Sequence, residues 1–363
     1  MKIALVGPTP PPNGGMAMQT LQLQQLLTER GHQVTLISTN APYRPAVVGR
    51  IPVIRSLFRL LPYLIRLLIQ IRQHDVVHLM SNSGWAWYLF SAPVIHIAHY
   101  YKIPCIVNYR GGLADEFLSR SAKRVHFTMR RATGLIVPSG FLKQVFNKYD
   151  ITSEVVPNIV NLELFQFRPF LPPQSLNDSL HLIVTRNLEA LYGNRYAIEA
   201  LALIIQQAPG AHMTIAGDGP ERASLEQLAH DLEVSDKIHF SGRLDRQQMA
   251  ELYAGADILI NPTTADNMPN SLLEAMACGI PVVTTAVGGI PYMVEQKKTA
   301  LLVEVGNARA IADAVLELLN DPLLASSLSQ NGHQQVIQYQ PDAVLPLWES
   351  CYQQQLAQQQ ELC

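Results

Sequence analysis

Two acidic residues, Asp266 and Glu274, flank a short polar loop in the segment NPTTADNMPNSLLEAMACGIPVV (261–283). Carboxylate oxygens accept hydrogen bonds from vicinal hydroxyl groups, such as those of a sugar or a ribose. A helix is expected to begin at Asn270 or Ser271 and to end at Gly279, so that its positive end and the loop before it face a ligand. Backbone N–H groups in that position are suited to a diphosphate. The residues of this expected diphosphate site are Asn267, Met268, Pro269, Asn270 and Ser271.

A purely structural explanation exists for one of these two acids. Ser271-Leu272-Leu273-Glu274 fits a capping box, in which a serine and a glutamate hydrogen-bond to the first backbone N–H groups of a helix. The capping box explains Glu274 but neither Asp266 nor the loop. The two roles are compatible, because a capped helix also directs its positive end at a ligand.

Two other positions follow expected strands and are suited to a phosphate. Arg186 ends the run HLIVTR (181–186), where its guanidinium is able to bind a diphosphate through two hydrogen bonds and stabilise it as a leaving group. A surface arginine explains it equally well. Gly14 and Gly15 lead from the proline-rich loop GPTPPPNGG (7–15) into a helix and allow a ligand close to the backbone. An ordinary strand-to-helix turn is the alternative, and the absence of GxGxxG disfavours a nicotinamide cofactor.

The elements that must position these residues are strands alternating with helices. Twelve short β-branched runs are predicted to be strands, and the polar segment 171–180 separates the first six from the last six. This alternation predicts an α/β protein with two parallel sheets facing a central cleft. In such sheets ligands bind where strands end at their carboxyl edge. The predicted strands are 2–7, 33–38, 76–81, 105–110, 134–139, 153–158, 181–186, 212–217, 238–242, 256–262, 281–286 and 300–304.

Composition excludes several classes of protein. A chain of 363 residues with 48% hydrophobic and 15% charged residues is expected to fold into more than one globular domain. Its four cysteines form no CxxC pair, so neither a zinc site nor a disulfide framework is indicated, and a reducing cytoplasm is expected. The first residues do not resemble an export signal. The apolar segment 78–101 contains three histidines and is interpreted as a buried helix rather than a membrane span.

The charge of the chain is strongly asymmetric. Before residue 165 there are 17 Lys and Arg against 7 Asp and Glu, and after it 10 against 22. Within 50–74, which has five arginines and no acid, Arg55, Arg59 and Arg66 fall on one side of a helix at about 100° per residue. This pattern favours docking on an anionic membrane surface, although a solvated stripe on a helix buried by its other faces is the alternative. Few aromatic residues are interleaved, so no nucleic-acid partner is expected.

Taken in order, several segments resemble glycosyltransferase family 4, whose members are retaining sugar transferases with the GT-B fold. Asp266 to Glu274 is similar to the E-x7-E signature of that family. The other resembling segments are the NGG loop, VPSGFL (137–142), VPNIVNLELF (156–165), TRNLEALY (185–192), IAGDGPER (215–222), FSGRL (240–244) and LLEAMACGIPVVTTAVGGIPYMV (272–294).

The resemblance implies a GT-B fold with two Rossmann-like domains. Residues 1–168 would form the acceptor-side domain, residues 169–344 the donor-binding domain, and a helix over 345–363 would pack back on the first. The co-substrate would be a nucleotide-diphosphate sugar, with no cofactor and no metal ion, because backbone dipoles and cations replace the metal.

The resemblance also implies roles for individual residues. Glu274 would hold the ribose, Asp266 would meet hydroxyl groups of the transferred sugar, and Arg186 would neutralise the diphosphate. Gly14 and Gly15 would approach the sugar phosphate.

Four positions depart from the pattern of the family. The first acid of the signature is Asp266, one methylene shorter than glutamate, and Tyr192 replaces a lysine often found six positions after the arginine. Arg110, in NYRGG, stands where the family usually has a histidine, and Asn161 where it commonly has an aspartate. Arg110 cannot act as a base near neutral pH, but it is suited to binding a phosphate or an acidic acceptor.

The sequence thus predicts a retaining, metal-independent glycosyltransferase. Its acceptor is expected to be a lipid-linked or membrane-proximal oligosaccharide of cell-surface polysaccharide or glycolipid assembly. The protein is expected to be cytoplasmic and peripheral on the inner face of the plasma membrane. One alternative is a nucleotide-sugar epimerase, for which His78 and His126 are the nearest acid/base candidates. Another is a degenerate, non-catalytic subunit that binds the nucleotide sugar.

Overall fold

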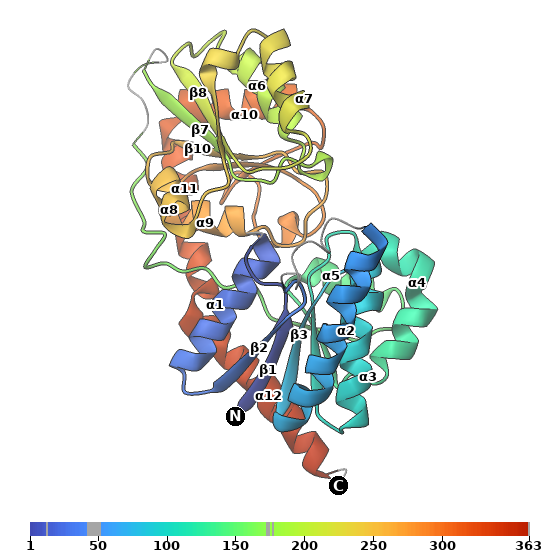
Figure 1. Cartoon of the computed structure of the whole chain (residues 1–363). Helices are drawn as coiled ribbons and strands as arrows, with labels where there is room; N and C mark the ends of the chain where they lie inside the picture. Colours follow the sequence, from blue (N-terminus) through green and yellow to red (C-terminus); the bar gives the residue numbers. More distant parts are fainter. Residues whose placement is uncertain (12–13, 42–51, 172–174, 176–177, 362–363) are drawn as a thin grey trace. The chain divides into compact units, whose positions relative to one another are not determined.

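The computed structural model describes residues 1–11, 14–41, 52–171, 175 and 178–361, without the side chains of 52–57, 360 and 361. The chain divides into two compact units, and each is described by itself (Figure 1). Unit 1 consists of Met1–Asn158 with Pro341–Cys363, and unit 2 of Ile159–Gln340. Within the described residues, each unit contains a six-stranded parallel sheet, so the two predicted parallel sheets are confirmed.

The sheet of unit 1 has the strand order β2-β1-β3-β4-β5-β6. Its strands are β1 (Lys2–Gly7), β2 (Gln33–Ser38), β3 (Val76–Ser81), β4 (Cys105–Tyr109), β5 (Gly134–Val137) and β6 (Glu154–Val155). Ile3 of β1 pairs with Val34 of β2 on one side and with Val76 of β3 on the other. The central strands β3 and β4 are buried along their whole length, as expected for a parallel sheet covered by helices on both faces.

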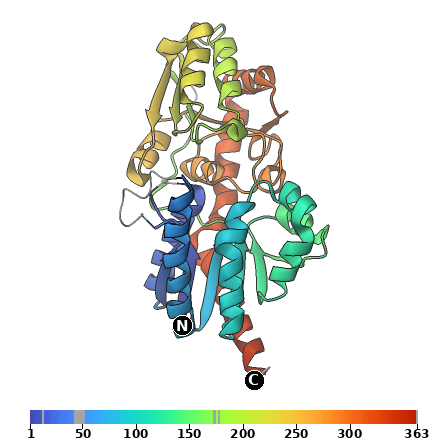
Figure 2. The same ribbon diagram turned by 45° about the vertical axis from the view of Figure 1, so that its right-hand side comes forward.

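The helices of unit 1 connect these strands. Their bounds are α1 (Gly15–Glu29), α2 (Pro52–Gln70), η2 (Ile71–Gln73), η3 (Trp87–Ser91), α3 (Ala92–Tyr100), α4 (Ala114–Met129), α5 (Gly140–Asn147) and α12 (Pro341–Glu361). Helices α2, α3 and α4 lie side by side in that order (Figures 1 and 2). The last helix, α12, contacts α1 and belongs to unit 1.

The sheet of unit 2 has the order β12-β11-β10-β7-β8-β9. Its strands are β7 (Leu180–Val184), β8 (Ala211–Ala216), β9 (Ile238–Gly242), β10 (Ile258–Asn261), β11 (Val282–Thr285) and β12 (Leu301–Val303). Its helices are η4 (Ala190–Tyr192), α6 (Asn194–Ile204), α7 (Arg222–Asp231), η5 (Ser235–Lys237), α8 (Arg246–Ala254), α9 (Asn270–Cys278), η6 (Ile290–Tyr292), α10 (Ala308–Asn320), α11 (Pro322–Val336) and η7 (Ile337–Tyr339).

The division between the units lies at Asn158–Ile159, ahead of the 168–169 boundary inferred from the sequence. The cause is the packing of the intervening residues with unit 2. The Val160 N–H group donates a hydrogen bond to the Tyr339 carbonyl at 3.0 Å, and Phe165 meets the ring of Tyr253 edge-on at 5.6 Å.

One segment differs from its sequence-based description. Segment 78–101 is not one buried helix: its first residues complete β3, and the helical part that follows exposes Trp85 and Tyr100. Helix α2 is continuous over Pro52–Gln70 with Pro62 inside it. No helix in the part of the chain that the structure describes is long and apolar enough to cross a membrane.

Candidate functional site

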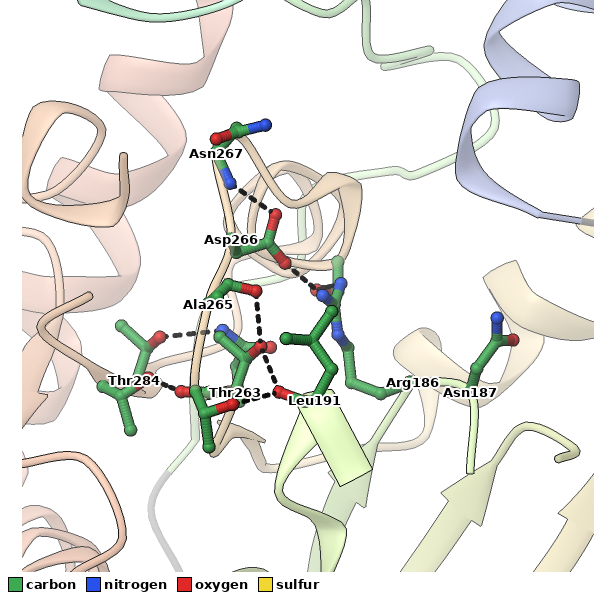
Figure 3. Close-up of polar contacts among 12 residues, drawn as sticks. Arg186, Asn187, Leu191, Thr263, Ala265, Asp266, Asn267 and Thr284 are labelled. Carbon is green, nitrogen blue, oxygen red and sulfur yellow. Dashed lines mark hydrogen bonds and ion pairs between the residues drawn. The ribbon is translucent and has the colours of Figure 1, made fainter. Parts of the chain in front are cut away.

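The carboxyl edge of the unit 2 sheet brings three loops together. β10 lies between β7 and β11, so the loops that follow these strands start side by side. The Thr264 N–H and hydroxyl groups donate to the Leu191 carbonyl at 2.8 and 2.9 Å, and the Thr263 hydroxyl donates to it at 3.2 Å (Figure 3). The Thr285 hydroxyl donates to the Thr263 carbonyl at 2.6 Å. These bonds fix the loop that carries Asp266 against the other two.

Two glycines after β11 seat the same loop. A Cβ on Gly288 would lie 2.0 Å from the Asp266 carbonyl oxygen, and one on Gly289 would lie 1.8 Å from that of Asn267. Gly288 also has a φ of +56°, which favours glycine. The Gly289 N–H group donates to the Asp266 carbonyl at 2.9 Å. Any side chain at Gly288 or Gly289 would therefore displace the loop that holds the candidate acid.

Arg186 is held on three sides. Its guanidinium forms an ion pair with the Asp266 carboxylate (Figure 3), lies 4.2 Å from the centre of the Tyr192 ring, and donates to the Ser271 hydroxyl at 3.5 Å. The Arg186 and Asp266 side chains are only 11% and 16% exposed, so water screens the pair weakly. Tyr192, at the position where the family often has a lysine, contributes a cation–π contact instead of a second charge.

Asp266 is oriented by both of its carboxylate oxygens. Oδ2 receives the Arg186 guanidinium, and Oδ1 accepts the Asn267 N–H at 2.8 Å (Figure 3). Each carboxylate oxygen accepts more than one hydrogen bond, so this arrangement leaves capacity for a ligand hydroxyl. The shorter acid is thus the counter-ion of Arg186, a pairing that the sequence did not reveal.

The predicted capping box is wrong. α9 begins at Asn270 with Pro269 as its N-cap residue and no side-chain cap, so Ser271 is already inside the first turn. The extended backbone of Pro269, with φ −65° and ψ 126°, leads the chain directly into the helix. At the other end, Gly279 adopts the left-handed conformation at φ +76° and terminates α9, as predicted.

Glu274 instead pairs with a tyrosine that sequence reasoning missed. The Tyr253 hydroxyl lies 3.1 Å from Glu274 Oε2, 3.3 Å from the Ser271 carbonyl and 2.8 Å from the Thr185 hydroxyl. Burial raises the pKa of Glu274 to about 7, and the Tyr253 hydrogen bond, Arg246 and Arg186 oppose this rise. The sequence did contain one indication of this role, because Tyr253 lies one turn after Ala250 on the buried face of α8.

The remaining loop residues lie between these groups. Asn267, Met268 and Pro269 are buried and Asn270 is half-buried, at the start of α9. Ser271 is buried and contacts both Arg186 and Tyr253 through its hydroxyl and carbonyl groups. The residues predicted for the diphosphate, Arg186 and both acids are thereby gathered at one edge of unit 2. Within the described ranges, no three His, Cys, Asp or Glu side chains cluster so as to hold a metal ion.

The other predicted site residues belong to unit 1. Gly14 precedes α1 in extended conformation, Gly15 is its first residue, and a Cβ on Gly14 would meet no atom within 4 Å. No internal contact therefore requires glycine at position 14. Arg110 follows β4 and donates to the side-chain oxygens of Asn108 and Asn158. Burial lowers the pKa of Arg110 to about 10, which leaves it charged at neutral pH.

Neither candidate histidine is an obvious acid or base. His78 is fully buried in β3, where its ring nitrogens lie 2.7 Å from the Tyr352 hydroxyl and 3.1 Å from the Asn108 amide nitrogen. Burial, with a smaller effect of Arg110, lowers its pKa to about 3. His126 is half-buried in α4. A histidine that is fully buried and neutral does not contact a substrate, which weighs against the epimerase alternative.

Helix α2 carries the predicted membrane arginines. Arg66 is exposed and Arg59 half-buried, whereas the side chain of Arg55 lies outside the described residues. The structure adds a feature that the sequence did not predict: some of the apolar side chains of α2 are exposed rather than packed against the rest of unit 1. Its exposed large apolar side chains are Phe58, Leu61, Ile65, Leu68 and Ile69.

Two protein families match the chain in succession. Residues 13–164 match Glycosyltransferase Family 4, and residues 172–335 match Glycosyl transferases group 1. N-acetyl-alpha-D-glucosaminyl L-malate synthase of Bacillus anthracis is 33% identical over 43% of this chain and 40% of that protein. The gpi3 subunit of phosphatidylinositol N-acetylglucosaminyltransferase from Schizosaccharomyces pombe is 24% identical over 90% of this chain and 75% of its own length. The match to the Bacillus relative thus spans less than half of that protein.

Solved structures resemble the chain over almost its whole length. HepE from Anabaena, in complex with UDP and glucose, has a TM-score of 0.76 at 18% identity and covers 97% of this chain and 99% of its own. Sucrose-phosphate synthase from Thermosynechococcus elongatus has a TM-score of 0.73 at 21% identity, with 98% and 99% covered. At these identities the likeness concerns the fold. The chain is therefore a glycosyltransferase with the GT-B fold, composed of a family 4 domain followed by a group 1 domain.

Proposed function

We propose that the protein transfers a sugar from a nucleotide-diphosphate sugar with retention of anomeric configuration and without a metal ion. The observation that carries this proposal is the weakly exposed Arg186 beside the start of α9, with Glu274 in the second turn of the same helix. A fixed cation and a helix N-terminus together suit a diphosphate, and a carboxylate a short way along suits a ribose. HepE, a protein with the same fold, has a solved complex with UDP and glucose, which supports this type of donor.

In this proposal Arg186 gives up part of its ion pair with Asp266 to bind the diphosphate of the donor. Before the donor binds, Asp266 neutralises the guanidinium. When the diphosphate arrives, the guanidinium and the backbone N–H groups from Asn267 to Ser271, other than Pro269, share its charge, and the positive end of α9 adds to them. Asp266 keeps Arg186 in place and offers its free lone pairs to hydroxyl groups of the transferred sugar. Glu274 accepts hydrogen bonds from the ribose.

The reaction then follows from charge stabilisation. The bond between sugar C1 and the diphosphate oxygen breaks through an oxocarbenium-like state, and the electron pair leaves with the nucleoside diphosphate. The acceptor hydroxyl attacks C1 from the face that the diphosphate leaves, and the departing phosphate takes its proton. The products are the glycosylated acceptor and a protonated nucleoside diphosphate. Arg186 and α9 stabilise the charge on the leaving group, which is the usual role of a metal in such transfers.

A screen of donors tests this proposal. Thermal shift and slow hydrolysis are measured with UDP-, GDP-, ADP- and TDP-sugars, each beside its nucleoside diphosphate. We expect one nucleotide to raise the melting temperature, and the Glu274→Ala variant to lose most of that shift. A shift that Glu274→Ala leaves unaltered would remove the ribose role of Glu274. A nucleotide sugar that is isomerised without an acceptor would favour the epimerase, and binding without turnover of any acceptor would favour the non-catalytic subunit.

The acceptor is proposed to be lipid-linked or membrane-proximal, and the protein to be peripheral on the cytoplasmic face of the membrane. The exposed apolar row of α2, in which Leu61 is 55% exposed, lies beside arginines on the same helix. This is the composition of a helix that lies in a membrane interface. The names of relatives such as the gpi3 subunit and a phosphatidylinositol monomannoside mannosyltransferase of Mycobacterium tuberculosis, 32% identical over 40% of this chain, also refer to lipids.

Vesicle binding tests the membrane part. Leu61→Ser with Ile65→Ser should release the protein from phospholipid vesicles, because the apolar contact of α2 is lost. Arg55→Glu, Arg59→Glu and Arg66→Glu together should release it from anionic vesicles. If the parent protein does not co-sediment with vesicles of any composition, the membrane proposal fails and the donor proposal is untouched.

A further inference from the structure

Helix α4 presents a basic surface that neither the fold nor the donor site requires. Three basic residues of α4 and the two that follow its last residue fall within one half of the helix circumference when the helix is continued at about 100° per residue. Phe127 lies among them and is 59% exposed, with the Arg131 guanidinium 4.2 Å from the centre of its ring. The five basic residues of this surface, here called the α4 basic row, are Arg120, Lys123, Arg124, Arg130 and Arg131.

Few acids compensate this charge. From residue 76 to 149 the sequence contains only Asp115 and Glu116, both in the first turn of α4. Asp115 pairs with Lys148 at 3.3 Å, and Glu116 pairs with Arg120 at 3.1 Å. No acidic residue occurs in the sequence from 117 to 149, so the last three turns of α4 carry their charge without an acidic neighbour along the chain.

The helix formed by η3 and α3 lies between this row and the arginines of α2. The Tyr63 hydroxyl of α2 donates to the Phe90 carbonyl at 2.8 Å, so the Tyr63 side of α2 faces η3. Arg59 and Arg66 lie about 40° and 60° from Tyr63 around α2, both on the same side of it. The arginines of α2 therefore lie within reach of the η3–α3 surface.

Ring contacts show which side of α4 faces the η3–α3 helix. Phe117 of α4 lies 6.3 Å from the Trp87 ring and 6.0 Å from the Tyr88 ring, so this side of α4 also faces η3. Arg124 lies about 20° from Phe117 around the helix, and Arg131 stands two residues beyond its end. Burial lowers the pKa of His96, and the positive charge of Arg131 lowers it further. Arg131 therefore lies within electrostatic range of α3.

The exposed side chains of α3 complete the surface between the two flanks. His96, His99 and Tyr100 are exposed there, and Tyr100 is 77% exposed. Aromatic and basic residues thus run from α2 over α3 to α4, three helices that lie side by side in Figures 1 and 2. The apolar row of α2 borders this surface.

We propose that the outer faces of α2, α3 and α4 form one membrane-docking surface, in which the α4 basic row binds the phosphate groups of anionic lipids. This inference rests on the proposed docking of α2 and adds a second contact to it. The apolar row of α2 enters the interface, while α4 contributes a purely electrostatic contact. Two contacts on one unit fix its rotation on the membrane, which a single helix does not.

The test uses the full-length protein and vesicles of phosphatidylcholine, with and without phosphatidylglycerol. The triple variant Lys123→Gln, Arg124→Gln and Arg131→Gln removes three charges from the α4 basic row. Its matched control, Lys297→Gln, Lys298→Gln and Arg309→Gln, removes three exposed charges from unit 2. The apolar variant Leu61→Ser with Ile65→Ser tests α2 separately. Nucleotide thermal shift reports that each variant is folded.

We expect the α4 triple variant to lose about a hundredfold in affinity for anionic vesicles, at roughly fivefold per charge near the surface. Its weak binding to pure phosphatidylcholine should remain, the unit 2 control should match the parent, and the α2 variant should lose both kinds of binding. Parent-like binding of the α4 variant to anionic vesicles, with loss in the α2 variant, would overturn this inference alone. The inference is also wrong if the triple variant keeps vesicle binding but loses binding to nucleic acid or to an acidic protein.

Discussion

The donor edge of unit 2 and the α2–α4 face of unit 1 both use arginine, but in opposite ways. At the donor edge, Arg186 is nearly buried and bound to a carboxylate, an aromatic ring and a hydroxyl. On the α2–α4 face, exposed basic side chains stand on helices that carry few acids. A guanidinium fixed in one position recognises a small ligand by geometry, whereas exposed charges attract an extended anionic surface through their electrostatic field. The predictions below test this difference, in order of decreasing effect.

Removing the fixed cation should have the largest effect on the reaction. Arg186→Ala should lower kcat/KM by about 10³-fold, because an electrostatic group that stabilises the leaving diphosphate is lost in a weakly screened site. Steady-state kinetics with the donor found in the screen measure it. Tyr192→Ala is the companion variant, since it removes the ring under Arg186 and keeps the charge. A loss below tenfold in Arg186→Ala would place the diphosphate elsewhere.

Neutralising the counter-ion should have an intermediate effect. Asp266→Asn keeps the size of the side chain but frees Arg186 from its ion pair, and we expect kcat/KM to fall about 10²-fold through misplacement of the guanidinium. Asp266→Glu restores the charge with the family's usual length and should recover much of the activity. If Asp266→Glu is as inactive as Asp266→Asn, the shorter acid is an essential feature of this site.

The pH dependence of donor binding should report on Glu274. Its pKa is raised to about 7, so the carboxylate is ionised above this value and half-protonated near it. Ribose hydroxyl groups donate to the ionised form, and the KM for the donor should therefore rise about tenfold per pH unit well below pH 7. Glu274→Gln should remove this dependence.

Stability should respond to the same carboxyl with the opposite sign. An acid whose pKa is raised by folding stabilises the folded chain below its unfolded value, and this contribution is lost as pH rises toward 7. Thermal unfolding without ligand should show a smaller decrease in melting temperature between pH 5 and 8 in Glu274→Gln than in the parent. Equal decreases in the two proteins would contradict the raised pKa.

Tyr253→Phe should have a smaller and more specific effect. The ring and its packing on Phe165 remain, while the hydrogen bond to Glu274 Oε2 at 3.1 Å is lost. Because this hydrogen bond lowers the Glu274 pKa, the KM profile should move to higher pH, with kcat changed less than threefold at high pH. Thr185→Val is a control that removes another partner of the same hydroxyl. An unmoved pH profile in Tyr253→Phe would leave Tyr253 with a packing role only.

Nucleotide binding at the donor edge should depend on salt much less than vesicle binding does. Raising the ionic strength should weaken binding to anionic vesicles by more than tenfold, because exposed charges are screened. The nucleotide affinity should change only a few-fold, since Arg186 is largely shielded from water. Titrations of both ligands over the same salt series make the comparison. Equal salt dependence would erase the proposed difference between the two regions.

Local patterns predicted the elements but not their contacts. β-branched runs predicted all twelve strands found in the described part of the chain, and Gly279 was expected to end α9, because strands and helix ends depend on nearby residues. The capping box failed because its residues lie two positions deeper in the helix than the pattern assumed. A motif of four residues does not fix which of them begins the helix.

The missed features all join residues that are distant in the sequence. The ion pair of Arg186 with Asp266 spans 80 positions, and the hydrogen bond of Tyr253 with Glu274 spans 21. Such pairs follow from strand order, which places the loops after β7 and β10 side by side. The exposure of Leu61 and Ile65 was missed for a related reason, because periodicity shows that a helix is apolar but not which apolar residues its neighbours cover.

The central claim is that Arg186 at the edge of unit 2 binds the diphosphate of the donor. Its most direct test is the ratio of affinities for a nucleoside diphosphate and the matching monophosphate, measured by calorimetry in the parent and in Arg186→Ala. Both ligands share the base and the ribose, so the ratio isolates the contact to the second phosphate. The account predicts a ratio well above ten in the parent that falls close to one in the variant. An equal ratio in the two proteins would contradict it.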